Sequence, residues 1–332
     1  MMRKSDLPTV SFVMPAYNAG MFIADAIKSV LAQTIDDWEL VVVDDGSSDD
    51  TVEVAESFSA TDCRIRVFRN DKNSGNAFPP RKAAVELSRG EIIAPLDADD
   101  EVEPCYLEKL LHNRSEFKTD VVYPVMHKMS VTGEKGGRYL PDDMFDMSVP
   151  YTGKELVRYT LDGWRIGTGG GIIGKDFYLK CMDSVEAAIL MNADEYLTRI
   201  ILIEASTVKI CDTRYFYREN QNSITREVSL KKFDILKTDY LLGKLIHFHF
   251  EEDSEECKRM EIQKFCDLID SVRYFNRNKD RFPPASHKKI KDMLHNAYRS
   301  VDWGYIKKYG GWKYYLLFRI GLTPAMKILN VL

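Results

Sequence analysis

Short apolar runs alternate with helix-length segments along the first 125 residues of this 332-residue chain. Each run is short enough to be one buried strand, and apolar residues repeat at helical spacing between the runs. This alternation predicts a doubly wound, mostly parallel α/β sheet. Right-handed crossovers would place the carboxyl ends of the strands at one edge. The predicted strands are 10–14, 39–43, 65–68, 92–96 and 121–123, and the predicted helices begin near 21, 51, 81 and 106.

The alternation loosens near residue 126, where loops rich in Gly, Asp and Pro begin. A helical pattern returns at 194–203, and residues 226–332 are helical and charged without a strand signal. We therefore expect one domain over residues 1–225, divided near residue 125, and a helical accessory domain over residues 226–332.

Two acidic clusters follow predicted strands directly. Asp44 and Asp45 follow the second strand, and Asp97 and Asp99 follow the fourth. Ligands bind beyond the carboxyl ends of such strands, so these acids are expected to meet in one crevice. An Asp-x-Asp pair offers oxygen ligands that bind Mg²⁺ or Mn²⁺ together with diphosphate oxygens. The alternative for each cluster is a solvated turn or a helix cap, but the position after two strands favours an enzyme acting on a metal-bound diphosphate.

Composition excludes several other classes of protein. A formal net charge of -5 argues against a nucleic-acid partner. The six cysteines form no CxxC pair and have no short spacing to histidine, so we expect neither a zinc site nor a disulfide framework. The first strand lacks G-x-G-x-x-G, the main support for a dinucleotide-dependent oxidoreductase. Without a signal-peptide pattern or a long apolar window, the sequence predicts a cytoplasmic protein or one at the cytosolic membrane face.

Four motifs in order resemble the family 2 glycosyltransferases of the GT-A fold. They are VSFVMPAYNAGMFIADAIKSVLAQT, WELVVVDDGSSDDT, the stretch holding Asn73, Gly75 and Arg81, and RGEIIAPLDADDEVEP. The resemblance covers roughly residues 8–225 and is closer up to about residue 110. It implies a Rossmann-like GT-A domain, with a nucleotide-sugar half over about 1–125 and an acceptor half over about 126–225. The implied activity is that of an inverting hexosyltransferase (EC 2.4), with a UDP-sugar as the expected donor and Mn²⁺ or Mg²⁺ as the cofactor.

The resemblance also implies the donor site. Asp44 would hold the uracil edge, Asp97 would approach the ribose or the sugar, and Asp99 would be the metal ligand. The spacing from Asn73 to Arg81 is one residue longer than is usual in the family. The nucleotide-sugar residues implied together are Pro15, Ala16, Tyr17, Asp44, Asp45, Arg81 and Asp97, and Arg218 is a candidate for a phosphate contact.

Asp194 is the candidate general base, by resemblance to a Glu-Asp pair that usually begins a helix. An inverting transfer needs a carboxylate that takes the proton of the acceptor hydroxyl. Ala193 stands where the family usually has Glu, so Glu195 remains the alternative base. The structural alternatives are an N-cap role for Asp194 and an i,i+4 pair of Glu195 with Arg199.

The acceptor contact is predicted in the glycine-rich stretch GWRIGTGGGIIGKD. Gly170 would let backbone approach a sugar ring, and the Trp164 indole would cover its apolar face, with core packing as the alternative for Trp164. The stretch also has the spacing of a phosphate-binding P-loop, but Asp176 occupies the Ser/Thr position and would repel phosphate.

The acceptor class and the oligomeric state of the protein are expectations from the resemblance alone. Members of the family act on glycan or polyprenyl-linked acceptors in surface polysaccharide biosynthesis, and a homo-oligomer is compatible with the sequence. Residues 307–332 mix Lys and Arg with aromatic residues, so they either lie in a membrane interface or pack on the core. The resemblance favours peripheral membrane attachment.

Two other functions stay open. A sugar nucleotidyltransferase shares a related core, but its Gly-Gly-x-Gly-Thr-Arg type of loop is absent from AYNAG. A catalytically silent glycan-binding subunit of an assembly complex is left open by Ala193. The sequence fixes neither the donor sugar nor the acceptor or linkage.

Overall fold

The computed structural model describes residues 7–139, 141, 144–161, 169–186, 189, 191–219, 228–310, 312–319 and 321–328. The chain forms two compact units. The first contains Met1–Leu156, Arg165–Glu186 and Leu197–Gln221, and the second contains Val157–Trp164, Ala187–Tyr196 and Asn222–Leu332. The predicted domain boundary after residue 225 lies outside the described residues.

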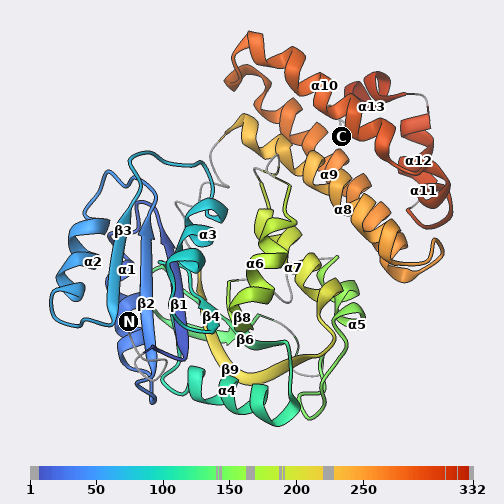
Figure 1. The fold of residues 1–332 in the computed structure, drawn as a ribbon. Coiled ribbons are helices and arrows are strands. Elements are labelled where there is room, and N and C mark those ends of the chain that lie inside the picture. Colours follow the sequence, from blue (N-terminus) through green and yellow to red (C-terminus); the bar gives the residue numbers. More distant parts are fainter. Residues whose placement is uncertain are drawn as a thin grey trace. The chain divides into compact units, whose positions relative to one another are not determined.

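The first unit is built on a mostly parallel sheet (Figure 1). Its first four strands run parallel in the order β3-β2-β1-β4. Every residue of β1 and β2 is buried, which explains their continuous apolar sequence. The doubly wound parallel core predicted from the sequence is confirmed. The four strands are β1 (Val10–Ala16), β2 (Trp38–Asp44), β3 (Ile65–Arg69) and β4 (Ile92–Pro95).

Helices connect these strands as the apolar spacing predicts. They are α1 (Ile23–Leu31), α2 (Thr51–Ser59), α3 (Phe78–Leu87) and α4 (Tyr106–Phe117). Helix α3 begins three residues before its predicted start because prolines fit the first turn, where a backbone N–H has no helical acceptor.

The second half of the sheet departs from the sequence prediction. Strand β8 lies antiparallel between β4 and β6, and β9 runs parallel to β6 and carries β5 on its other edge. The expectation of loops here was wrong for β8, which is too short to show a period. No strand was predicted for β9, where a register shift opposite β6 breaks the alternation. These strands are β5 (Glu101–Val102), β6 (Val121–Met129), β7 (Lys135–Arg138), β8 (Ile172–Gly174) and β9 (Val208–Arg218).

Three further helices accompany these strands. They are α5 (Gly153–Val157), α6 (Lys175–Asp183) and α7 (Ala193–Glu204). Helix α7 matches the helix predicted at 194–203 to within one residue at each end.

Helices form the C-terminal part of the second unit, as predicted. They are α8 (Ile235–His249), α9 (Glu255–Asn278), α10 (Pro284–Ser300), α11 (Trp303–Tyr309), α12 (Trp312–Arg319) and α13 (Leu322–Ile328). Their buried apolar side chains form one core that includes Phe233, Phe265 and Phe275. Within the described part of the chain, no helix is both long and apolar enough to span a membrane.

The predicted membrane-interface segment contributes to this core. Phe318, Leu322 and Ala325 are buried in it, and the Phe318 ring packs edge-on against Phe265 and stacks on Trp303. For these side chains the structure therefore shows core packing, which was the alternative to membrane contact in the sequence analysis. Peripheral attachment of the segment stays a prediction.

Candidate functional site

Asp44 ends β2 and organises the loop that follows it. Its carboxylate accepts hydrogen bonds from the backbone N–H of Gly46 at 3.1 Å and of Ser47 at 3.0 Å, and from the Ser47 hydroxyl. Gly46 has a φ of 75°, a left-handed conformation that glycine adopts without a Cβ clash. Asp44 is buried, and its hydrogen bonds form the turn that the sequence left open as its structural alternative. Its predicted contact with a uracil edge stays a prediction.

Asp45 links the ends of three segments at the same edge of the sheet. Its N–H donates to the Ala16 carbonyl at 2.8 Å, and its carboxylate accepts from Asn70 at 2.9 Å and from the Ser74 N–H at 2.8 Å. Of the predicted base-pocket residues, Pro15 and Ala16 are buried at the end of β1, while Tyr17 is exposed just beyond it. The structure therefore places these predicted nucleotide-binding residues along one edge.

Arg81 and Asp97 form an ion pair at the start of the acidic loop, by which we mean residues 97–100 after β4. The Arg81 Nη2 atom donates to Asp97 Oδ1 at 2.6 Å, and only 3% of the Arg81 side chain is exposed. Both residues were predicted in the donor site, but the sequence did not predict that they pair. This pair fixes the Asp97 carboxylate against α3, whereas the predicted nucleotide contacts of both residues stay predictions.

Asp100 belongs to the acidic cluster found in the sequence, where no site role was assigned to it, and in the structure it anchors the acidic loop. The Tyr215 hydroxyl donates to Asp100 Oδ2 at 2.6 Å, and the Arg218 N–H donates to Oδ1 at 2.8 Å. Burial raises the pKa of Asp100 well above its usual value, and the neighbouring carboxylates of Asp99 and Asp97 add to the shift. Asp99 is half-buried between these anchored acids.

Arg218 supports the same loop from below. Its Nε donates to the Asp99 carbonyl at 2.8 Å, Nη1 to the Val131 carbonyl at 3.1 Å, and Nη2 to Glu101 Oε1 at 2.7 Å. The guanidinium is almost fully buried, so its observed contacts hold protein backbone and a carboxylate. A phosphate contact of Arg218 stays a prediction. Identifying residues 208–218 as a strand would have placed Arg218 in the sheet without showing these partners.

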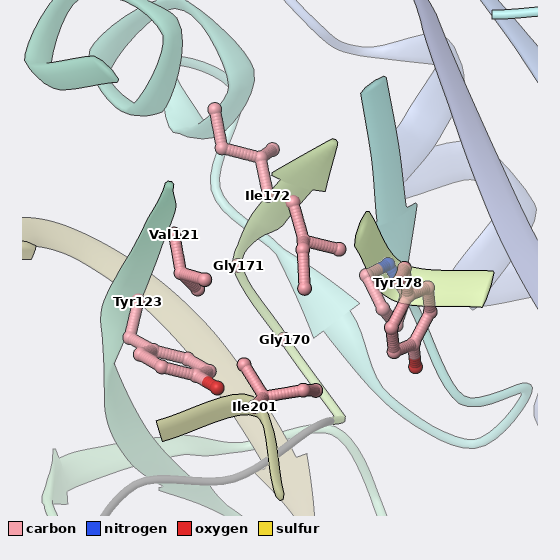
Figure 2. Close-up of a pocket in the computed structure, with 9 residues that line it drawn as sticks. Val121, Tyr123, Gly170, Gly171, Ile172, Tyr178 and Ile201 are labelled. Carbon is pink, nitrogen blue, oxygen red and sulfur yellow. The ribbon is translucent and has the colours of Figure 1, made fainter. Parts of the chain in front are cut away.

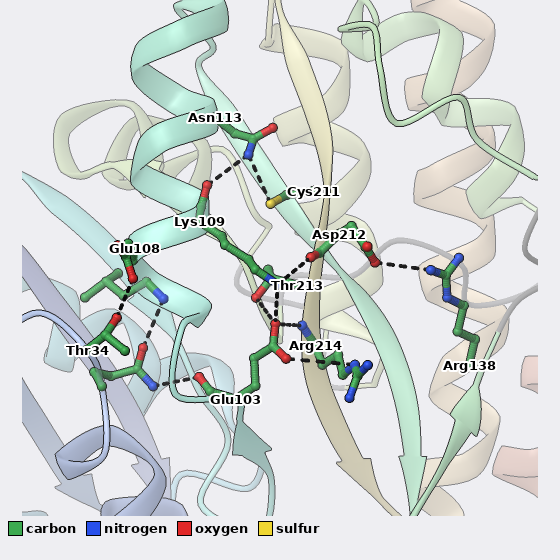
Figure 3. Close-up of polar contacts among 12 residues, drawn as sticks. Thr34, Glu103, Glu108, Lys109, Asn113, Arg138, Cys211, Asp212, Thr213 and Arg214 are labelled. Atoms are coloured by element: carbon green, nitrogen blue, oxygen red, sulfur yellow. Dashed lines mark hydrogen bonds and ion pairs between the residues drawn. The ribbon is translucent and has the colours of Figure 1, made fainter.

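Glu103 ties β9 to the segment that follows the acidic loop (Figure 3). Its Oε1 atom accepts from the Thr213 hydroxyl at 2.8 Å, from Arg214 N–H at 3.1 Å and from Lys109 Nζ at 3.2 Å. Burial alone would raise the pKa of Glu103, but hydrogen bonds led by those from Thr213 and Lys109 outweigh burial and lower it. The carboxylate is therefore held ionised at the register shift of β9.

Within the glycine-rich stretch, Gly170 lies directly against the Tyr215 ring. A Cβ on Gly170 would lie 2.7 Å from Tyr215 Cδ2, and a Cβ on Gly169 would lie 3.6 Å from Asp97 Oδ2. Gly171 has a φ of 100°, and its N–H donates to the Tyr106 hydroxyl at 2.6 Å. Gly170 is thus needed for packing. Its predicted acceptor contact stays a prediction, and Trp164 lies outside the described residues.

An apolar pocket lies beside this stretch (Figure 2). Its volume is about 10 Å³, which is room for about one water molecule and not for a sugar. The pocket is a packing gap rather than a donor site. Its labelled lining residues are Val121, Tyr123, Gly170, Gly171, Ile172, Tyr178 and Ile201.

The candidate bases lie in the first turn of α7. Asp194 is the second residue of the helix, after Asn192, which has a φ of 56°, and Ala193. The Asn192 amide donates to Glu195 Oε1 at 3.2 Å. Asp194 therefore lies inside the helix rather than at the cap position. The assignment of Asp194 as base stays a prediction.

A divalent cation suits the donor chemistry of the acidic loop. Mg²⁺ is usually bound by one or two carboxylates together with substrate phosphates and water. Asp99 offers one half-buried carboxylate of this kind, and Asp97 offers a second oxygen beside Arg81. Across the described ranges, no group of three or more His, Cys, Asp or Glu side chains could hold a metal by itself.

Comparisons with known proteins agree with this geometry. GlyG of Streptococcus pneumoniae, a glycosyltransferase, is 27% identical over 65% of this chain and 73% of its own length. A chondroitin synthase of Escherichia coli is 27% identical over 78% of this chain, although the match spans only 34% of that enzyme. Residues 1–349 of S. aureus TarS share the fold with a TM-score of 0.69 and 16% identity, over 97% of this chain and 89% of that fragment. A crystal structure of that fragment with UDP-GlcNAc has a TM-score of 0.66.

The match to a family model covers more than half of the chain. It extends over residues 11–182, from the first strand of the sheet to the last turn of α6, and so includes both acidic clusters and the glycine-rich stretch. The chain therefore belongs to glycosyl transferase family 2.

Proposed function

We propose that this protein is an inverting, metal-dependent glycosyltransferase of polysaccharide biosynthesis. It moves a sugar from a nucleotide diphosphate sugar, with UDP as the leaving group, to a hydroxyl of a glycan or lipid-linked acceptor. The observation that carries the proposal is the anchored acidic loop, in which Asp100 is held by Tyr215 and Arg218 while Asp99 is left half-buried at the sheet edge.

Donor binding uses the loops at this edge. Asp44 and Asp45 order the loops that would receive the nucleoside, and the Arg81–Asp97 pair holds one carboxylate of the loop in a fixed position. Crystal structures of TarS with UDP-GlcNAc and with UDP support a uridine nucleotide as the donor. The names of the chondroitin and hyaluronan synthases among the relatives support a polysaccharide product.

Asp99, with Asp97 beside it, would hold Mn²⁺ or Mg²⁺. A bound divalent cation would neutralise the charge that develops on the departing diphosphate. The protein supplies the position of the loop, since the Asp99 carbonyl is fixed by Arg218.

Transfer with inversion requires one proton acceptor from the protein. The acceptor oxygen forms a bond to the anomeric carbon, the bond from that carbon to the diphosphate oxygen breaks, and the hydroxyl proton passes to a carboxylate. We assign this carboxylate to Asp194, with Glu195 as the alternative. Asp194 lies in the first turn of α7.

Calorimetric titration tests the donor site first. Wild type and Asp99→Ala are titrated with UDP and with GDP, each in Mn²⁺ and in EDTA. We expect UDP to bind in Mn²⁺, to bind at least tenfold more weakly in EDTA, and to lose its metal dependence in Asp99→Ala. UDP-sugars are then screened for transfer.

The same titration separates the remaining alternatives. A wild-type protein that binds neither nucleotide would support the silent glycan-binding subunit. UDP binding that is equal in Mn²⁺ and EDTA would overturn the metal assignment and leave the transferase proposal standing. Release of pyrophosphate from a nucleoside triphosphate and a sugar phosphate would identify a nucleotidyltransferase instead.

A further inference from the structure

One face of the second half of the sheet presents exposed side chains next to the acidic loop. Tyr215 and Tyr217 are two residues apart on β9, so they point to the same face. On that face the Tyr215 hydroxyl reaches Asp100. Burial and then the carboxylates of Asp100, Asp99 and Asp97 raise the pKa of Tyr217 to about 12.

Tyr139 completes an aromatic corner with Tyr217. The ring centroids are 6.3 Å apart, and the ring planes stand at 83°. The Tyr139 N–H donates to the Met126 carbonyl at 2.8 Å, which fixes Tyr139 beside β6. The exposed fractions of the two side chains are 43% for Tyr139 and 37% for Tyr217. Two exposed aromatic walls at right angles suit the apolar face and the hydroxyls of a pyranose ring.

Lys128 adds a positive charge to this corner. Lys128 is the register partner of Tyr217 on β6, so both side chains leave the same face of the sheet. Its Nζ lies 5.4 Å from the centroid of the Tyr139 ring, and the side chain is exposed. Two neighbouring cationic side chains are engaged in ion pairs, Lys135 with Glu101 and Arg138 with Asp212.

We infer that Tyr139, Tyr217 and Lys128 form an acceptor subsite that binds an acidic glycan. The two rings stack on a sugar of the acceptor, and the Lys128 ammonium pairs with a carboxylate carried by that glycan. The inference rests on the proposed glycosyl transfer. Tyr217 shares a face of β9 with Tyr215, which contacts Asp100, so the subsite lies next to the acidic loop that would bind the donor. It names residues other than Trp164 and Gly170 as the acceptor contact.

Binding of two hexasaccharides tests the subsite. One probe alternates N-acetylglucosamine and glucuronate, and the other is the neutral maltohexaose. Dissociation constants are measured by NMR titration with and without UDP and Mn²⁺, on wild type, Tyr139→Ala, Tyr217→Ala, Tyr217→Phe and Lys128→Gln. We expect wild type to prefer the acidic probe, and both Ala variants to bind it about tenfold more weakly.

The remaining variants separate stacking from charge and from folding. Tyr217→Phe keeps the ring and should bind like wild type, whereas Lys128→Gln should lose the preference for the acidic probe. Tyr240→Ala removes an exposed tyrosine from α8 in the second unit and serves as the matched control. UDP affinity should be the same in all of these variants.

Two results would overturn the subsite. They are a wild type that binds neither hexasaccharide although it binds UDP, and Ala variants that bind the acidic probe as tightly as wild type. A wild type that binds no UDP overturns the proposed function instead. The titrations without UDP then still decide whether the glycan binds at this corner.

Discussion

The Tyr215 hydroxyl donates a 2.6 Å hydrogen bond to the buried Asp100 carboxylate, across 115 residues of sequence. This bond joins β9 to the loop that carries Asp97 and Asp99. The backbone N–H of Arg218 completes the anchor of the same carboxylate. The geometry of the proposed donor site therefore depends on a strand far along the chain.

Tyr215→Phe should loosen this anchor without changing the shape of the core. A buried acceptor that loses a partner costs about 1–3 kcal/mol, so the free energy of unfolding should fall by that amount. UDP affinity should also fall, because Asp100 loses one of the two donors that hold its carboxylate. Urea unfolding and UDP titration measure the two effects, with Tyr240→Phe as the exposed control. Unchanged values in both measurements would contradict a supporting role for Tyr215.

Arg81→Met should damage the donor site more than the loss of a surface ion pair. Removing one partner of a fully buried pair costs about 3–5 kcal/mol. Because 30% of the Asp97 side chain is exposed, the cost here should lie at or below the lower end of that range. Asp97 would then be displaced or protonated, and UDP affinity should fall at least tenfold. Lys180→Gln breaks the exposed Lys180–Glu204 pair and should cost no more than about 1 kcal/mol. Equal effects of the two substitutions on UDP binding would refute the role of Arg81.

Gly170→Ala should be poorly tolerated, although it adds only one methyl group. The new Cβ would lie 2.7 Å from the Tyr215 ring and 3.1 Å from Pro124, so the glycine-rich stretch must shift. Overpacking of this kind costs about 1–3 kcal/mol. Gly137→Ala is the matched control, since nothing lies within 4 Å of its added Cβ. Thermal unfolding of both variants tests the prediction, and similar melting temperatures would oppose it.

Glu39 should make stability depend on pH in the acidic range. Burial alone would raise its pKa, but hydrogen bonds from Arg89, Ser11 and Arg66 outweigh burial and lower the pKa below the ordinary 4.5. The unfolded chain then binds more protons than the folded chain between these two pKa values. The stabilisation is therefore fully present above about pH 4.5, and is lost as the pH falls through the lower folded value.

The free energies of unfolding of wild type and Glu39→Gln test this pH dependence. They are measured between pH 3 and 7 at intervals of about 0.5 pH units. Glu39→Gln should lower stability at neutral pH by about 3 kcal/mol and flatten the pH dependence. A variant with the wild-type slope would assign that slope to other carboxyl groups.

Asp194→Asn should abolish transfer while donor binding persists. Loss of a general base lowers turnover by about 100-fold to 10,000-fold. The matched substitution Glu195→Gln changes the neighbouring carboxylate and should leave most of the turnover. Single-turnover assays with a UDP-sugar, together with UDP titration, compare the two. The reverse ranking of the variants would assign the base to Glu195.

The sequence predicted the part of the fold in which burial is complete. Strands β1 and β2 are buried at every position, so their apolar runs showed directly which residues pack inside. The acids at their ends followed from the general rule for parallel sheets. Membership of the glycosyltransferase family, also predicted, is confirmed by the family match.

The sequence did not predict the partners of those acids. Periodicity describes which face of a segment is buried, but it carries no information on contacts made more than 100 residues away. Tyr215, Arg218 and Asp100 were therefore missed as one anchor, and β9 was not recognised because its register shift mixes exposed charges into the strand. The pair of Arg81 and Asp97, which are 16 residues apart, was missed because periodicity does not show which side chains meet at the end of an element.

The pairing of β5 with β9 also sets the order in which the protein is assembled. Glu101 lies opposite Phe216 in this pairing, so the strand that steadies the acidic loop is synthesised long after the loop itself. Contacts of such large sequence separation form late, because a long loop of chain must first be closed. A nascent chain that ends near residue 125 already contains β1 to β4 and the Arg81–Asp97 pair, but it lacks the strand that anchors Asp100. The proposed donor site is therefore completed only when the second half of the sheet has folded onto the first.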